Sequence, residues 1–196
     1  NKPIKSSHIS GIFLFLPLIT NTTGMDIKQY LDSTYLKTAQ QANLSEEENT
    51  QVVKNCIQEA IDNNFKLIMI RPDKVVLAKE MIQNAKSKVT IGTVIDFPEG
   101  DGALADKLAE ATQAIYDGAD DLDFVVDYKA FKNDEFDKVK TQVLEGTKLG
   151  LKHNKIVKWI IEVAALNNHQ ILQLYALIKN VVIVNYNEKK KEKVFV

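Results

Sequence analysis

The sequence predicts an α/β fold, most simply a TIM (β/α) barrel that is incomplete, with about six of the eight β/α units of a closed barrel. Apolar runs of strand length alternate with helical patterns at a period of roughly 25–35 residues, and such alternation requires right-handed crossovers and a parallel sheet. Polar side chains follow the expected strands at their carboxyl ends, where barrels and open α/β folds carry their sites; they are Asp32, Arg71, Asp96, Asp127 and Glu162. No glycine-rich dinucleotide fingerprint or phosphate loop follows any strand, which disfavours a nucleotide-binding fold.

The expected strands are short apolar runs bounded by polar or turn residues. The run at 65–70 stops at Arg71 and Pro72, because proline cannot donate to a strand ladder. The run at 89–95 ends in a polar segment, and the run at 122–126 is opened by the Gly118 turn. In chain order, the expected strands are 31–37, 65–70, 89–95, 122–126, 155–162 and a last one that begins at 194.

Helices are expected between these strands, where apolar residues recur at helical spacing. Ser45 and Glu48 form a capping-box signature, and Asn64 suits the left-handed residue at the end of the same helix. Gly118 and Gly150 end two later helices. The expected helices are 26–30, 45–64, 73–84, 103–116, 136–149 and 168–183, and the charge run at 188–193 is expected to be a solvated turn.

Residues 1–24 differ in composition from the domain expected at 25–196. Their apolar run at 12–19 contains Pro17 and is too short to span a bilayer. A basic start would suit a signal peptide, but no Ala-x-Ala-like cleavage site follows. We therefore interpret 1–24 as a non-native or untranslated leader before Met25, unstructured or poorly packed against the domain.

Composition excludes several classes of partner and cofactor. The chain of 196 residues is 45% hydrophobic and 26% charged, with a net charge of -1, so it has no electrostatic footprint for nucleic acid or an anionic membrane. The single cysteine, Cys56, lies on the apolar face of a helical pattern, and its isolation fits a reducing cytoplasm. The three histidines have no metal-ligand spacing, and the sequence has no Cys/His cluster, so no metal site is expected. We expect no other cofactor.

Two charges interrupt apolar strands. Asp123 lies within the run 122–126, and Lys158 interrupts the run 155–162. A buried charge must be paired or neutralised, because it loses its hydration. Asp123 is therefore either a structural carboxylate satisfied by backbone donors or a lysine, or a catalytic group. We expect Asp123 and Lys158 to face the barrel interior within one hydrogen bond or one bridging water of each other.

Four segments resemble motifs of the deoxyribose-phosphate aldolases, in that family's order and spacing: Leu-Asp-Ser-Thr-Tyr-Leu-Lys at 31–37, Thr-Val-Ile-Asp-Phe-Pro-Glu-Gly at 93–100, Gly-Ala-Asp-Asp-Leu-Asp-Phe-Val-Val at 118–126 and Lys-Trp-Ile-Ile-Glu at 158–162. The resemblance covers 25–196. It implies a cytoplasmic class I aldolase that reversibly cleaves 2-deoxy-D-ribose 5-phosphate to D-glyceraldehyde 3-phosphate and acetaldehyde through a lysine Schiff base, without a metal, in deoxyribonucleotide and carbohydrate catabolism. It also implies that Asp123 is the acid/base carboxylate, that Lys158 accompanies it, that Asp32 and Thr34 lie near the bound sugar, and that a homodimer forms.

The sequence departs from the family at its end. The family's Schiff-base lysine follows the sixth strand, and 193–196 match only the residues that lead into that motif. We therefore expect a C-terminally truncated chain that lacks the nucleophile and two strands and is inactive alone. Lys158 is not expected to replace the missing nucleophile. The alternative is a non-catalytic α/β protein that uses the same scaffold to bind a sugar phosphate or a partner. The coding sequence beyond residue 196 would discriminate the two.

Overall fold

The computed structural model describes residues 11–14 and 26–196, and in these residues it forms one seven-stranded sheet whose strands follow chain order. Strands β2 to β7 run parallel, as the sequence predicts, whereas β1 is antiparallel to β2. The strands are β1 (Gly11–Leu14), β2 (Leu31–Tyr35), β3 (Leu67–Ile70), β4 (Thr90–Ile95), β5 (Asp121–Val125), β6 (Ile156–Ile160) and β7 (Val194–Phe195).

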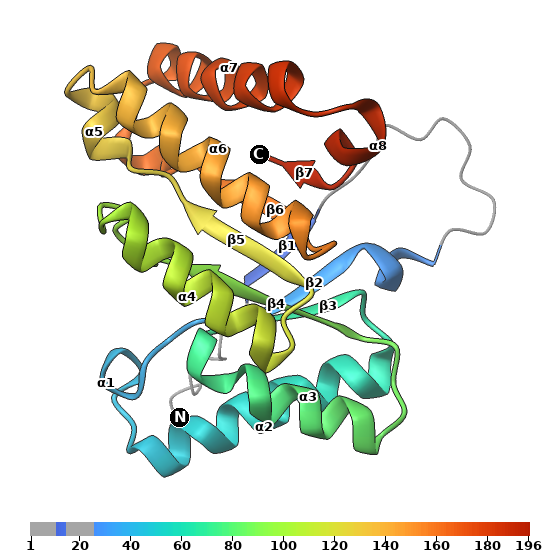
Figure 1. Cartoon of the computed structure of the whole chain (residues 1–196). Coiled ribbons are helices and arrows are strands. Elements are labelled where there is room, and N and C mark those ends of the chain that lie inside the picture. Colours follow the sequence, from blue (N-terminus) through green and yellow to red (C-terminus); the bar gives the residue numbers. More distant parts are fainter. Residues whose placement is uncertain (1–10, 15–25) are drawn as a thin grey trace.

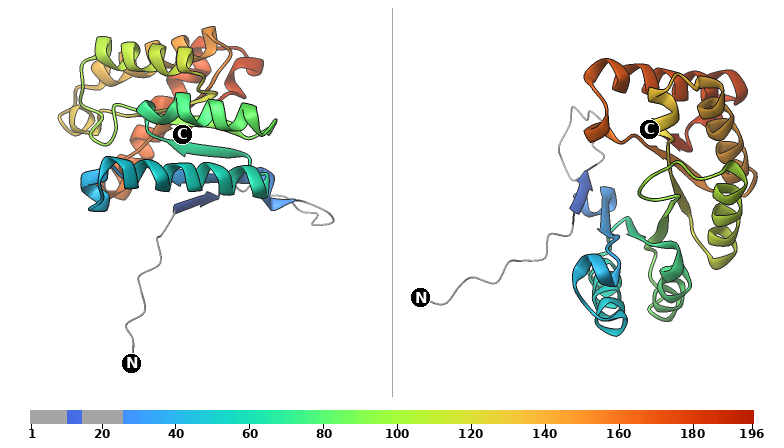
Figure 2. Two further views of the ribbon diagram at one scale, coloured as in Figure 1. Left: turned by 90° about the horizontal axis from the view of Figure 1, so that it is seen from below. Right: turned by 90° about the vertical axis from the view of Figure 1, so that its left-hand side faces the viewer.

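The long helices pack around the outside of this curved sheet and leave its inner face uncovered by helices (Figures 1 and 2). The long helices are α2 (Glu46–Asn63), α3 (Val75–Asn84), α4 (Leu104–Asp117), α6 (Phe136–Lys152) and α7 (Asn168–Asn185). Shorter helical segments are η1 (Ile27–Tyr30), α1 (Ala39–Ala42), η2 (Pro72–Lys74), α5 (Tyr128–Lys132), η3 (Val163–Ala165) and α8 (Glu188–Lys191). This arrangement is the incomplete (β/α) barrel that the sequence predicts. The charge run at 188–193, expected as a turn, instead contains α8.

Local signals in the sequence set the helix ends. The Ser45 hydroxyl accepts a hydrogen bond from the Glu48 backbone N–H, and the Glu48 carboxylate accepts one from the Ser45 N–H. Asn64 ends α2 with a φ of 52°, in the left-handed region that asparagine tolerates. Gly118 ends α4 with a φ of 116°, a conformation that residues with a Cβ rarely adopt. The capping hydrogen bonds and the left-handed end residues satisfy the backbone N–H and C=O groups at the helix ends, which have no partner within the helix.

The apolar core has two parts, one on each face of the sheet. The larger lies between sheet and helices, and there Phe124 stacks on Trp159 with ring centroids 4.9 Å apart. Cys56 is buried in this part, as the helical pattern predicts. The smaller part lies on the inner face and consists of Leu67, Met69 and Val94, with Leu36, Phe97 and Ile160 packed against it. The inner face therefore carries apolar side chains, and a charged group buried next to them loses hydration.

Part of the expected leader is described as β1, which pairs with β2 through Gly11–Leu14. The sequence pattern does not predict a strand at these residues. The other positions of 1–24 lie outside the described residues, so the interpretation of this segment as a leader remains a prediction. No described helix is long and apolar enough to cross a membrane.

Candidate active site

Three carboxylates surround the ammonium group of Lys158. Its Nζ lies 3.1 Å from Asp121 Oδ2, 3.4 Å from Asp123 Oδ1 and 3.4 Å from Asp32 Oδ2. Lys158 donates a hydrogen bond to Asp32, from which it is separated by 126 residues in the sequence. We call these four residues the acid–lysine cluster. The predicted proximity of Asp123 and Lys158 is confirmed.

The sheet register places the cluster on the inner face. Asp123 of β5 is paired with Lys158 of β6 and with Val94 of β4, which belongs to the inner apolar cluster. Side chains at paired positions of neighbouring strands point to the same face, and so do side chains two residues apart along one strand. Asp121 therefore points to the same face as Asp123. Asp32 reaches the cluster from β2, at the other side of the curved sheet. It is the second residue of β2, so the prediction that Asp32 lies at the carboxyl end of its strand is wrong.

Burial and charge set the protonation of the cluster. Burial raises the pKa of Asp123 to about 7; Lys158 opposes this rise, and the negative charges of Asp121 and Asp32 add to it. Burial also raises the pKa of Asp121, again against the attraction of Lys158. Burial alone would lower the pKa of Lys158, but the attraction of Asp123, Asp121 and Asp32 outweighs it and holds that pKa well above its ordinary value. At neutral pH the cluster therefore combines a fixed cation with a carboxyl group that can exchange a proton.

The Asp123 carboxyl is buried and incompletely paired. Its Oδ1 atom has no hydrogen-bond partner among the described residues, although Lys158 Nζ lies within ion-pair distance. A buried polar atom without a hydrogen bond is uncommon in proteins and is often associated with catalysis or with an unfilled site. This buried oxygen therefore retains hydrogen-bonding capacity that the described side chains do not fully use.

Thr34 lies beside the cluster without joining it. It is two residues from Asp32 on β2, and its hydroxyl donates to the Asp32 carbonyl oxygen at 3.4 Å. No ion-pair or hydrogen-bond contact joins it to Lys158 in the described part of the chain. Of the four predicted site residues, Asp32, Asp123 and Lys158 therefore come together and Thr34 flanks them.

Two further charged groups are buried that the sequence pattern does not predict. Asp121 precedes the apolar run of its strand and resembles a turn residue, yet its side chain is only 8% exposed. Its spacing of two residues from Asp123 was the available signal. Lys107 of α4 is also buried: it donates to the Gly100 and Val125 carbonyl oxygens at 2.6 and 3.1 Å and pairs with Asp96 at 3.2 Å. Through these hydrogen bonds and this ion pair, Lys107 links the segment after β4 to the end of β5.

The described residues contain no group of three histidine, cysteine, aspartate or glutamate side chains arranged to hold a metal ion. The three carboxylates of the acid–lysine cluster instead point at Lys158, which supplies positive charge at their centre. The chemistry that the cluster offers is proton transfer near a fixed ammonium group.

Comparison with known proteins relates this fold and site to aldolases. No family model matches the chain. A deoxyribose-phosphate aldolase of Thermococcus gammatolerans is 35% identical over 156 residues, which are 80% of this chain and 66% of that protein. A solved structure described as QR15, an aldolase, matches with a TM-score of 0.67 at 26% identity, covering 80% of this chain and 65% of that one. The tetrameric deoxyribose phosphate aldolase of Aeropyrum pernix matches with a TM-score of 0.64 at 26% identity, covering 76% and 58%.

A parallel sheet with helices outside and an acid–lysine cluster inside defines the class of protein: an incomplete, barrel-like (β/α) fold of the aldolase type. Within that class, the chain is a homologue of the deoxyribose-phosphate aldolases. The resemblance carried by the four sequence motifs is thereby confirmed. The chain spans about two thirds of the length of the curated relatives that it matches.

Proposed function

We propose that this chain carries the proton-transfer part of a deoxyribose-phosphate aldolase site. The reaction is the reversible cleavage of 2-deoxy-D-ribose 5-phosphate to D-glyceraldehyde 3-phosphate and acetaldehyde through a lysine Schiff base, in the cytoplasm. The observation that carries the proposal is the buried Asp123 carboxyl, whose Oδ1 has no hydrogen-bond partner among the described residues and which lies 3.4 Å from a lysine ammonium on the inner face.

Asp123 is the proposed acid/base. An aldol cleavage removes a proton from one hydroxyl group and later returns a proton to the carbanion carbon. A group does both most effectively when its pKa lies near the working pH. Burial raises the pKa of Asp123 to about 7, which suits this double role.

Lys158 is the proposed supporting cation, not the nucleophile. A lysine that forms a Schiff base must lose its proton, and enzymes favour this by lowering its pKa with a dry pocket or another cation. Lys158 has the opposite surroundings, because three carboxylates hold its pKa above the ordinary value. We accordingly expect residues 1–196, tested alone, to show no aldolase turnover, since the Schiff-base lysine implied by the family motif is not among them.

Asp32 and Thr34 are the proposed sugar-binding residues. Both are half-buried on β2, and Asp32 belongs to the acid–lysine cluster. A carboxylate oxygen and a hydroxyl group at this position can accept and donate hydrogen bonds to sugar hydroxyls.

A homodimer is proposed from the resemblance, while the Aeropyrum pernix relative is described as tetrameric. Light scattering of the purified protein would report its oligomeric state.

The test is a retro-aldol assay with 2-deoxyribose 5-phosphate and borohydride trapping of the imine. Two proteins are compared: the 196-residue chain, and a chimaera in which the C-terminal third of the Thermococcus gammatolerans relative continues it. We expect turnover and a trapped adduct in the chimaera only, and loss of turnover when Asp123 is changed to Asn. Trapping on Lys158 in the 196-residue chain would refute its supporting role. A folded chimaera that binds the sugar phosphate without cleaving it would instead support the non-catalytic alternative.

A further inference from the structure

We propose that Asp121 is a positioning residue, which holds the Lys158 ammonium as its permanent counter-ion and leaves Asp123 as the carboxyl that exchanges protons with substrate. This inference rests on the proposed function for its catalytic meaning. Its electrostatic content can be tested without any turnover.

The position of the ammonium group supports this division of roles. Lys158 is directly opposite Asp123 in the β5–β6 ladder, where Asp121 is opposite Ile156. The Lys158 side chain nevertheless brings Nζ closer to Asp121, at 3.1 Å, than to Asp123, at 3.4 Å. Lys158 Nζ is therefore shared between its own ladder partner and Asp121, although Asp121 lies two residues from that partner along β5.

The low exposure of Asp121 makes its charge depend on a nearby cation. The Asp121 side chain is 8% exposed, compared with 14% for Asp123 and 17% for Asp32. A carboxylate with so little access to water stays ionised only when a cation compensates the lost hydration. Among the described residues, Lys158 is the only cation paired with Asp121. Asp121 and Lys158 thus stabilise each other's charge.

The charge on Asp121 also acts on Asp123 in two ways with the same sign. As a negative neighbour on the same face, it disfavours ionisation of Asp123 directly. Asp121 also competes with Asp123 for the same cation, because the Lys158 ammonium lies within ion-pair distance of both carboxylates. The neighbouring strand β6 contributes Lys158, and the paired positions on the other neighbour, β4, are Gly92 and Val94, which carry no charge. The remaining charged group, Asp32, reaches the cluster from β2 across the curved sheet.

The experiment is a carbon-13 NMR titration of the aspartate side-chain carboxyls in the 196-residue chain. In the unmodified protein, we expect Asp121 to ionise at a lower pH than Asp123, whose midpoint should lie near 7. In Asp121→Asn, we expect the Asp123 midpoint to fall by about one pH unit or more, which is a tenfold change in proton affinity. Asp32→Asn should lower it less, since Asp32 is the weaker of the two negative influences.

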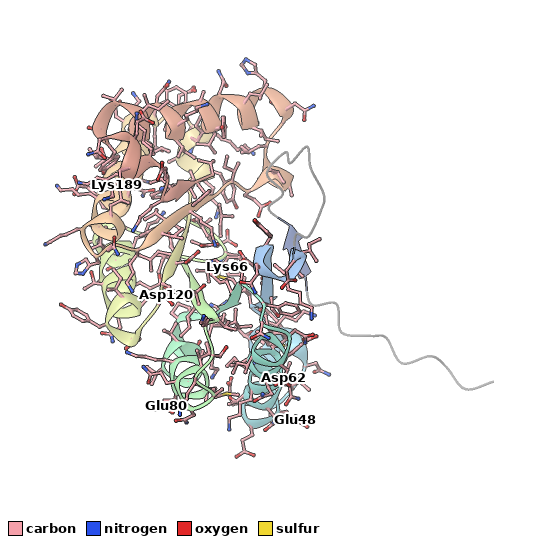
Figure 3. The ribbon with its side chains drawn as sticks, turned by 90° about the vertical axis from the view of Figure 1, so that its right-hand side faces the viewer. Glu48, Asp62, Lys66, Glu80, Asp120 and Lys189 are labelled. Carbon is pink, nitrogen blue, oxygen red and sulfur yellow. The ribbon has the colours of Figure 1, made fainter. Side chains whose placement is uncertain are left out.

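A matched control removes a charge that the cluster does not include. Asp62 is exposed on α2, on an outer helix (Figure 3), and Asp62→Asn should leave the Asp123 midpoint unchanged. An unmoved Asp123 midpoint in a folded Asp121→Asn protein would overturn the proposal. If that variant does not fold, the unmodified protein still decides, because ionisation of Asp123 below Asp121 would overturn the proposal equally.

The catalytic consequence is measured separately in the active chimaera. There, Asp121→Asn should move the acid limb of the kcat/KM profile to lower pH by the same amount as the NMR midpoint. A residue that only stabilises the fold would lower activity without moving the limb, and that result would refute a positioning role. An inactive chimaera would contradict the proposed function and leave the NMR result standing.

Discussion

Replacing Asp123 with Asn should make the protein more stable at neutral pH and leave its stability at acidic pH almost unchanged. The folded protein holds this carboxyl in an environment that favours the protonated form, which an amide imitates in shape and charge. The stability that protonation of Asp123 provides is present below the ordinary pKa of 3.8 and is lost as the pH rises through about 7. In Asp123→Asn nothing at this position titrates, so that loss disappears.

The size of the effect follows from the two pKa values. The interval between 3.8 in the unfolded chain and about 7 in the folded protein corresponds to about 4 kcal/mol of unfolding free energy. This figure is an upper bound, since relaxation around the ionised group reduces it. We therefore expect the difference between Asp123→Asn and the unmodified protein to grow by about 2–4 kcal/mol between pH 4 and pH 8.

Urea unfolding at four or five pH values measures this difference, and the sole tryptophan is a suitable probe. Trp159 is buried, stacks on Phe124 and donates its indole N–H to the Thr147 hydroxyl, so unfolding changes its surroundings completely. The exposed-site variant Asp62→Asn serves as the control for the general effect of removing one negative charge. A difference for Asp123→Asn that stays constant within about 0.5 kcal/mol would refute the account of Asp123 as a desolvated acid.

Three further substitutions test the other charged and capping contacts. Lys158→Met leaves three carboxylates without their cation and should lower the unfolding free energy by about 3 kcal/mol at pH 8. The loss should be smaller at pH 4.5, because Asp123 is protonated there. An equal loss at the two pH values would contradict the proposed electrostatics of the cluster. Lys107→Met removes a cation that is 2% exposed and should cost about 3 kcal/mol in urea unfolding, whereas the exposed-site variant Lys54→Met should change stability by less than about 0.5 kcal/mol. Ser45→Ala removes the N-cap of α2 and should cost about 1 kcal/mol by thermal or urea unfolding; no measurable loss would show that the capping hydrogen bonds do not contribute.

The sequence predicted the parts of the fold and site whose signals are local. Asp123 and Lys158 could be found because each interrupts an apolar run, and the start of α2 could be found because its capping box is contiguous. Asp121 was missed because it lies at the edge of its run, where a polar residue is ordinary.

Other features could not be predicted because they depend on contacts distant in sequence. The Asp32 carboxylate meets Lys158 only through the curvature of the whole sheet. The sequence pattern named Asp32 as one of five polar residues at strand ends, and only the resemblance assigned it to the site. Lys107 occupies a helical position that a solvated lysine would also occupy, and its burial depends on carbonyl groups from two other segments. The pairing of β1 with β2 likewise joins segments with no shared pattern in the sequence.

The pairing of β1 with β2 decides how this sheet can grow. A strand has two edges of backbone donors and acceptors. One edge of β2 is hydrogen-bonded to β3 and the other edge is hydrogen-bonded to β1. In a closed barrel the outer edge of the first parallel strand belongs to the last one. A strand that closed this sheet onto β2 would therefore compete with residues Gly11–Leu14 for the same amides and carbonyls, and ring closure would be an exchange reaction in which one strand is displaced by another.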